Sequence, residues 1–211
     1  VNYDLDLFYF DFETFQSNNI FEVYAVGFIH DGVYNKFYGI NAMIDFVNYI
    51  VDNVKNKKFV SYNGGKFDYL LLIKELINNP RIELKNYLKN GSRLLQYEFN
   101  GNTIFDLINF TSCSLKQACA DYGISSDKCK SEFDHNLIKS WDDVEKYKSD
   151  VLPYLELDLI SMKELLTIFN NEMFNLQEVN ITDYITLSSL SYDCWNRYIY
   201  ELNQELKQNG Y

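Results

Sequence analysis

Apolar and polar residues alternate along the first part of the chain in the manner of β-strands. Residues 5–14, 21–30 and 33–39 are rich in aromatic and β-branched side chains. Asp31-Gly32 separates the last two segments and is a strong signal for a two-residue hairpin turn. The pattern therefore predicts three antiparallel strands at the start of the fold.

The pattern then changes to helical spacing. Residues 42–54 place apolar side chains three and four positions apart, and Asn41 stands at the N-cap position. A short strand is predicted over 58–63, and an apolar helix over 67–77 ends near Pro80.

Strands and helices continue through the rest of the chain. Residues 93–110 form a predicted hairpin around Asn100-Gly101. Antiparallel strands followed by alternating helices and strands indicate an α/β fold, with a mixed sheet flanked by helices, a β-hairpin and a C-terminal helical tail. The later helices are predicted at 114–122 with Ser114 as cap, at 141–149 with Ser140 as cap, at 152–174 with Pro153 in the first turn, and at 188–206.

Composition limits the class of protein. The 211 residues are 47% hydrophobic, enough for one sizeable core. There is no apolar run of the roughly 18 residues that a membrane span needs, and the N-terminus lacks secretory features, so we expect an intracellular protein that meets no membrane. Four cysteines without a C-x-x-C pair, and two histidines, argue against a zinc finger. Because the chain begins with Val1, we expect a processed protein or a piece of a longer one.

The net charge of −11 argues against a simple nucleic-acid-binding protein, which usually carries a basic surface. It does not argue against an enzyme that meets phosphates through bound cations. Carboxylate ligands add to the negative count, and the cations reverse the local field.

The first predicted strand carries two acids within the aromatic run LFYFDFETF. Because side chains alternate along a strand, Asp11 and Glu13 share one face, and Phe10 and Phe12 share the other. Buried carboxylates are costly unless they are paired or bind a metal. This stretch alone leaves two interpretations open, an edge strand with a solvated face or one half of a metal site.

Two further stretches place acids on helices. YNGGKFD puts Asp68 at the start of a helix, where the helix dipole favours a negative charge, with Asn63 and two glycines close by. It is not a P-loop, because the first glycine of that motif is missing and Phe67 stands where Ser or Thr must bind magnesium. PYLELDL puts Tyr154 and Asp158 four residues apart on one face of an apolar helix.

In order along the chain, D-x-E, N-x-x-x-F-D and Y-x-x-x-D resemble the motifs of the DEDD superfamily of 3′–5′ exonucleases. The histidine subclass needs a histidine five positions before the last Asp, where Pro153 stands. Tyr154 fits the tyrosine subclass, which is found in the proofreading domains of DNA polymerases. The resemblance implies a ribonuclease H-like fold.

Over roughly residues 7–170 the chain resembles, more closely, the protein-primed family B DNA polymerases of phages and linear plasmids. FDFET, which ends in Thr14, and YNGGKFD are similar to the first two exonuclease motifs of that family, the second with one residue more before Phe67 than the family often has. Ser114-Leu115 resembles its single-strand-binding motif, and KSEFDH, with Lys130 and Asp134, resembles its catalytic lysine segment. The polymerase motifs D-x-x-S-L-Y-P and Y-x-D-T-D do not occur.

The resemblance implies hydrolysis assisted by two divalent ions, Mg²⁺ or Mn²⁺, held by carboxylates. It makes Asp11 the bridging ligand, assigns Glu13 and Asp158 to the ion that activates water, and assigns Asp68 to the second ion.

The remaining roles also follow from the resemblance. Tyr154 is expected to orient the attacking water, and Lys130 to offset charge on the scissile phosphate. Phe67 is equally open to interpretation as a core residue under the helix. The residues expected to hold the 3′ end of the DNA are Thr14, Tyr62, Asn63, Phe67, Ser114 and Leu115.

Three functions stay open from the sequence. The leading one is the proofreading exonuclease domain of a protein-primed polymerase of a virus, plasmid or organelle, over 1–174, with a helical extension over 175–211 leading toward an absent polymerase domain. Its partners would be a single-stranded DNA 3′ end, a polymerase domain in cis and a priming terminal protein. The alternatives are a free-standing exonuclease on DNA or short RNA, and a non-catalytic domain that binds single strands or a priming protein.

Overall fold

A seven-stranded mixed sheet forms the centre of the protein in the computed structural model, which describes residues 7–125 and 133–208. The sheet order is β3-β2-β1-β4-β7-β6-β5; the first three strands are antiparallel, and β1, β4 and β7 are parallel. The predicted α/β class with an antiparallel start is confirmed. The strands are β1 (Leu7–Ser17), β2 (Ile20–His30), β3 (Val33–Tyr38), β4 (Lys58–Ser61), β5 (Leu84–Asn90), β6 (Arg93–Phe99) and β7 (Asn102–Asp106).

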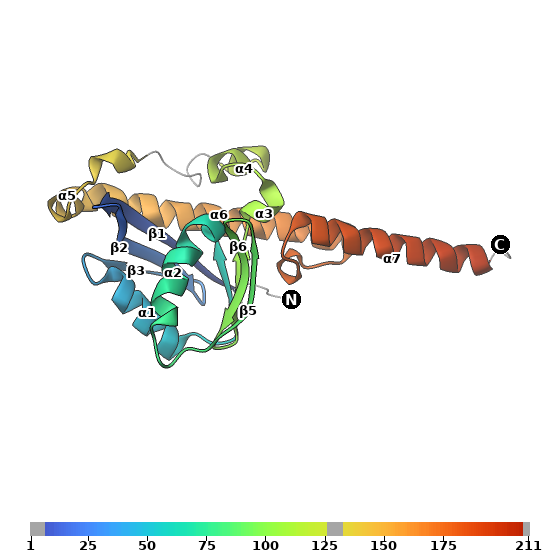
Figure 1. Ribbon diagram of the computed structural model, residues 1–211. Coiled ribbons are helices and arrows are strands. Elements are labelled where there is room, and N and C mark those ends of the chain that lie inside the picture. The colour runs from blue at the N-terminus through green and yellow to red at the C-terminus, as the bar shows by residue number, and fades with distance from the viewer. Residues whose placement is uncertain (1–6, 126–132, 209–211) are drawn as a thin grey trace.

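Helices cover both faces of the sheet, α1 and α2 on one and the long α6 on the other (Figure 1). The alternation along β1 explains this arrangement, because Phe8, Phe10 and Phe12 pack with α1 and α2 while Leu7 and Tyr9 face α6. The helices are α1 (Ala42–Asn53), α2 (Asp68–Ile77), α3 (Ile108–Thr111), α4 (Leu115–Asp121), α5 (Trp141–Lys146), α6 (Lys148–Gln177) and α7 (Leu187–Gln208).

The predicted hairpins are confirmed, and one strand was not predicted. Asn100-Gly101 and Asp31-Gly32 have positive φ at both positions, as a tight hairpin turn requires. The missed strand is β5, which pairs with β6 across a turn at Gly91. Its sequence, LKNYLKN, is exposed after Leu84, so it shows no alternation of buried and solvated positions.

The boundary between α5 and α6 was predicted wrongly. The helix predicted over 141–149 ends at Lys146, and α6 begins at Lys148, so Pro153 lies inside α6 rather than in its first turn. Tyr147 alone separates the two helices. Proline in a helix interior removes one hydrogen bond, and packing of α6 on the sheet outweighs this loss.

Two of the three predicted caps are confirmed. Ser114 accepts a hydrogen bond from the Gln117 amide, and Ser140 accepts one from the Asp143 amide. Asn41 occupies the N-cap position of α1, but its side chain makes no capping hydrogen bond.

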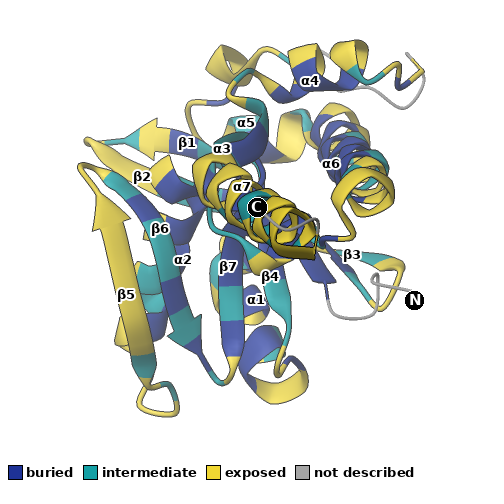
Figure 2. Ribbon diagram, turned by 90° about the vertical axis from the view of Figure 1, so that its right-hand side faces the viewer, coloured by how far each residue is buried: buried dark blue, intermediate teal, exposed yellow. Residues whose placement is uncertain are grey.

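The predicted tail helix is α7, which projects from the body of the protein beyond the end of α6 (Figure 1). Leu190 is its one buried residue among 187–208, and most of the helix is exposed (Figure 2). In the described part of the chain, no helix combines the length and the apolarity that a membrane span requires. The three described cysteines, Cys113, Cys119 and Cys194, are free thiols.

Candidate active site

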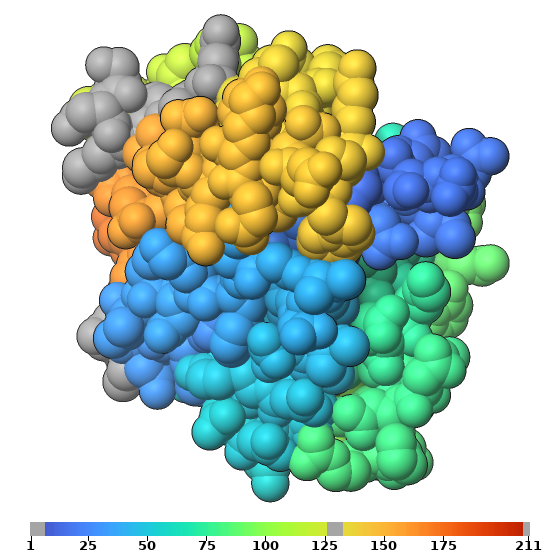
Figure 3. Space-filling view, turned by 90° about the vertical axis from the view of Figure 1, so that its left-hand side faces the viewer, coloured from blue at the N-terminus to red at the C-terminus, as the bar shows by residue number. Residues whose placement is uncertain are grey.

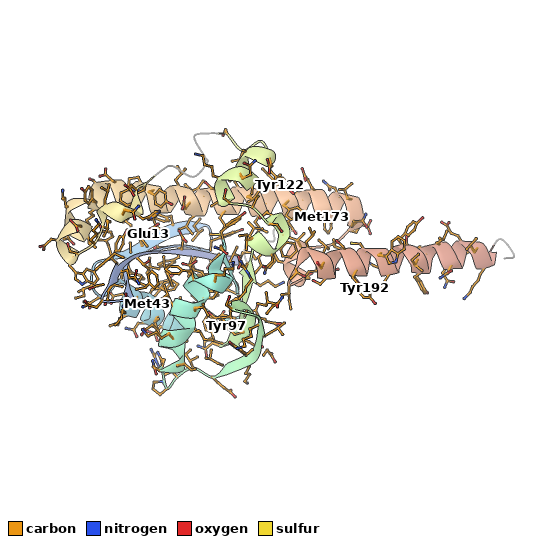
Figure 4. All side chains as sticks on the ribbon, turned by 45° about the horizontal axis from the view of Figure 1, so that its top comes forward. Glu13, Met43, Tyr97, Tyr122, Met173 and Tyr192 are labelled. Carbon is orange, nitrogen blue, oxygen red and sulfur yellow. The ribbon has the colours of Figure 1, made fainter. Side chains whose placement is uncertain are left out.

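The acids of the first motif lie on an interior strand, so the edge-strand interpretation is wrong. β1 pairs with β2 on one side and with β4 on the other. The pairing with β4 covers Leu7 to Tyr9 and stops before Asp11. Asp11 and Glu13 therefore project past the carboxyl end of β4, on the face that α6 covers, where Figure 4 places Glu13. This is the edge of an open α/β sheet at which ligands usually bind.

A glycine on β2 lets α6 approach this strand. Gly27 pairs with Asp11, and a Cβ at Gly27 would lie 2.8 Å from side-chain atoms of both Leu155 and Leu159. These two leucines are fully buried against the sheet. The close approach brings Asp158, which precedes Leu159 on the same helix, to the acids of β1.

Three carboxylates meet at this point. One oxygen each of Asp11, Glu13 and Asp158 lies within 4.8 Å of the other two. Glu13 and Asp158 are buried, while Asp11 is partly exposed. A hard divalent cation prefers carboxylate oxygens, so the donor set fits Mg²⁺ or Mn²⁺. The cluster could hold such an ion, as the sequence predicted for these three residues.

Asp68, at the start of α2, lines the smaller hollow beside the cluster but is not one of the three grouped carboxylates. It is 4% exposed, and among the described residues its Oδ1 has no hydrogen-bond partner. Burial, followed by the negative charges of Glu13 and Asp106, raises the pKa of Asp68 to about 7. A cation next to it would reverse this shift.

Tyr154 and Asp158 share one face of α6, as their spacing predicted, and each is 3% exposed. Burial and the nearby carboxylates of Asp158, Glu13 and Asp11 raise the pKa of the Tyr154 hydroxyl far above its usual value. The hydroxyl therefore stays protonated and can act as a hydrogen-bond donor within the acidic cluster.

Two adjoining hollows meet at the acids. The larger, of about 840 Å³, runs from Asp11 and Asp158 toward α4, and the smaller, of about 410 Å³, runs toward the start of α2 and the β1–β2 hairpin. Six residues line both hollows, so the two form one continuous groove with the acids midway. The shared residues are Asp11, Tyr62, Asn63, His135, Tyr154 and Asp158.

The groove brings together the residues predicted to hold substrate. Ser114 and Leu115 line the larger hollow, and Thr14 and Phe67 line the smaller one. Phe67 belongs to no buried cluster of the described chain, which argues against its interpretation as a core residue.

Tyr62 and Lys130 are the other two predicted site residues. Tyr62 donates a hydrogen bond to the Cys113 carbonyl at 2.8 Å, so its hydroxyl anchors the segment that carries Ser114. Lys130 lies outside the described residues.

Asp106 was not predicted, and it fixes the loop of the second motif. It accepts hydrogen bonds from the amides of Asn63 (2.7 Å) and Gly65 (2.9 Å) and from Arg93 Nη1 (2.8 Å). Arg93 Nη2 also donates to the Asn63 side chain at 2.8 Å. The sequence offered two signals for this contact, an acid at the end of a strand and an N-G-G loop. Buried loop amides need acceptors, and such an acid can provide them.

Both glycines of this loop are required by their surroundings. A Cβ at Gly64 would collide with Ser61 Oγ, and one at Gly65 would collide with the Leu94 carbonyl. The additional residue of the second motif is accommodated in a short 3₁₀ turn over Gly64–Lys66, with Asn63 in the left-handed conformation.

Two aromatic neighbours of Glu13 were also missed. Nδ1 of His135 lies 3.2 Å from Glu13 Oε2, and its ring lies 5.3 Å from that of Tyr154. Tyr24 is fully buried, and the pKa of its hydroxyl is raised by burial and by Glu13. The strand register shifts between Glu13 and Thr14, which leaves Tyr24 as the additional residue of a bulge. A bulge carries no signal in a single sequence.

Known proteins with similar sequences are DNA polymerases. The sequence model of the family described as DNA polymerase type B, organellar and viral, matches residues 141–209. The DNA-directed DNA polymerase of Enterobacteria phage PRD1 is 26% identical over 170 residues, 80% of this chain. The chain is similar to protein-primed family B DNA polymerases. A DNA polymerase of Kluyveromyces lactis is also 26% identical, over 160 residues and 68% of this chain.

Solved family B polymerases share the fold. Phi29 DNA polymerase in an orthorhombic crystal form superposes with a TM-score of 0.67 and 15% identity, over 92% of this chain and 34% of its own. Phi29 DNA polymerase complexed with single-stranded DNA superposes with a TM-score of 0.60 and 11% identity, over 79% and 31% of the two chains. The chain spans 28% of the PRD1 polymerase and 16% of the yeast polymerase.

Proposed function

We propose that this protein is a 3′–5′ exonuclease that removes nucleotides from single-stranded or frayed DNA 3′ ends, as the proofreading part of a protein-primed family B DNA polymerase. The observation that carries the proposal is the meeting of Asp11, Glu13 and Asp158 within 4.8 Å at the centre of a groove. These acids come from two distant parts of the chain, and Asp68 and Tyr154 line the same groove. The similarity to family B polymerases supports the assignment.

The chemistry follows from the donor set. Asp11, Glu13 and Asp158 would hold divalent cations, and Asp68, which lines the same groove, would complete the set. Two such ions, when bound, supply activation of water and stabilisation of charge in an in-line displacement at phosphorus. Tyr154 holds its proton and positions the attacking water, and Lys130 offsets charge on the phosphate.

The groove extends to both sides of the acids. In this proposal Thr14 and Phe67 hold the terminal nucleotide in the smaller hollow, Ser114 and Leu115 hold the strand in the larger hollow, and Asn63 lies where the two hollows meet. We assign the exonuclease to residues 1–174 and the extension to 175–211. The polymerase part and the priming protein are the proposed partners, in replication of viral, plasmid or organellar DNA.

Incubation with 5′-labelled single-stranded DNA and Mg²⁺ tests the proposal. We expect a ladder of products shortened from the 3′ end, release of mononucleotides, slower attack on blunt duplex, and arrest by EDTA. Incubation with an RNA strand of the same sequence tests the alternative of an RNA exonuclease, because that enzyme would degrade the RNA strand. Degradation from the 5′ end, or turnover that persists in EDTA, would refute the proposal, and binding without cleavage would favour the non-catalytic alternative.

A further inference from the structure

The β1–β2 hairpin carries an exposed aromatic residue beside the proposed site. Phe21 lies next to the hairpin turn at Asn18-Asn19, opposite Gln16, and is 45% exposed. The hairpin projects at one side of the molecule (Figure 3). Its neighbour Ile20 is 54% exposed but lines neither hollow of the groove.

Phe21 reaches the groove through Phe67. Their ring centroids are 5.0 Å apart and their planes are at 89°. Both rings line the smaller hollow, together with Thr14 and the acids. Two perpendicular rings form a corner, so a flat ring stacked on one of them presents its edge to the other, which is a favourable aromatic geometry.

The packing of the protein does not explain this pair. Neither ring belongs to the three buried clusters of the described chain, and Phe21 keeps 45% of its surface exposed. An exposed aromatic in a groove whose carboxylates could hold divalent cations suits a ligand with a planar apolar part and a phosphate, because the cations would reverse the repulsion between the carboxylates and the phosphate. A nucleotide of single-stranded DNA has both.

We propose that Phe21 and Phe67 form a base-stacking subsite, in which Phe21 is a further substrate-binding residue and holds a nucleobase of the strand next to the scissile phosphate. The assignment rests on the proposed exonuclease function, and it deepens that function by naming a contact made by the hairpin. Stacking of this kind tolerates any base, because every base has an aromatic face.

Four variants test the subsite. Phe21→Ala should raise the KM for a thymidine oligonucleotide roughly 5- to 20-fold, in the lower range for loss of one stacked base, and leave kcat within about twofold. Phe21→Leu keeps an apolar cover over Phe67 but removes the aromatic face, and it should show the same defect. Phe21→Trp should restore the parent KM. The matched control Ile20→Ala should behave as the parent, with equal melting temperatures throughout.

Binding measured in Ca²⁺ gives a readout independent of turnover. The tryptophan of Phe21→Trp should be quenched by the oligonucleotide, and that of Ile20→Trp should not. If the parent degrades DNA while Phe21→Ala and Phe21→Leu keep its KM, the subsite is overturned and the exonuclease function stands. A parent that binds DNA with the predicted Phe21 dependence but does not cleave supports the subsite and overturns the function. A parent that neither binds nor cleaves overturns both.

Discussion

Asp106 and Asp68 are both buried, and they differ in what surrounds them. Asp106 accepts hydrogen bonds from Arg93 and from two loop amides, which offset part of its burial, although its pKa is still raised. Asp68 has an Oδ1 without a described hydrogen-bond partner and a pKa near 7. The comparison separates an acid that stabilises the loop from an acid that lines the same groove as Asp11, Glu13 and Asp158, three carboxylates that could hold a cation.

The largest expected effect comes from removing the acids of β1. Asp11→Ala combined with Glu13→Ala should abolish cleavage of single-stranded DNA and leave the fold intact. The apo protein should keep or increase its melting temperature, because two like charges are lost from one strand face. A melting temperature far below that of the parent would show that these acids stabilise the fold, as Asp106 does.

Two variants of α6 separate a metal ligand from a positioning residue. Tyr154→Phe removes one hydroxyl and should lower kcat on the order of 10²-fold or less, with metal affinity unchanged. Asp158→Ala should lower kcat further and weaken metal binding, because it removes a ligand oxygen. Enzyme kinetics on both variants measures kcat, and metal titration measures the affinity for the cation. Equal loss of metal affinity in the two would contradict the role of Tyr154.

The same isosteric change at Asp68 and Asp106 tests the comparison directly. Asp106→Asn leaves Arg93 without its ion pair and turns amide hydrogens toward loop donors, so it should lower the free energy of unfolding by about 2–3 kcal/mol. Asp68→Asn should keep or raise it near pH 7, because a neutral amide replaces a buried charge, and should still abolish activity. Urea unfolding of the metal-free proteins gives both numbers. Equal destabilisation by Asp68→Asn and Asp106→Asn would contradict the difference in role between the two acids.

The smallest expected effect is on the pH dependence of stability without metal. The folded-state pKa of Asp68 is raised from 3.8 to about 7, so the folded protein retains a proton that the unfolded chain has lost. Its contribution to stability is full below about pH 4 and is lost as the pH rises toward 7. Unfolding in EDTA across this range should show the decline, and Asp68→Asn should reduce it. A flat profile in the parent would contradict the shift.

The elements that could be predicted are those with a strong local signal. The hairpin turns at Asp31-Gly32 and Asn100-Gly101, and the caps Ser114 and Ser140, depend on residues next to them in sequence. β5 was missed because it is exposed on both faces, and the boundary at Tyr147 because packing of α6 overrides the local effect of Pro153.

The site was predictable where ordered acids resemble known motifs. The sequence indicated Asp11, Glu13 and Asp158, which the structure groups, and Asp68, which lines the same groove. It could not indicate Phe21, which the hairpin brings to the groove, or Tyr24, which lies at the bulge beside Glu13.

The separation of the acids along the chain bears on the order of folding. Asp11 and Asp158 come from the first strand and from a helix near the other end, so they meet only when α6 docks over Gly27. Such distant contacts form late, after the cost in loop entropy has been met. During synthesis the sheet can assemble with Asp11 and Glu13 still in water, and their repulsion by Asp158 arises in the final step. A divalent cation held by these three acids would therefore stabilise the docking of α6 rather than the formation of the sheet.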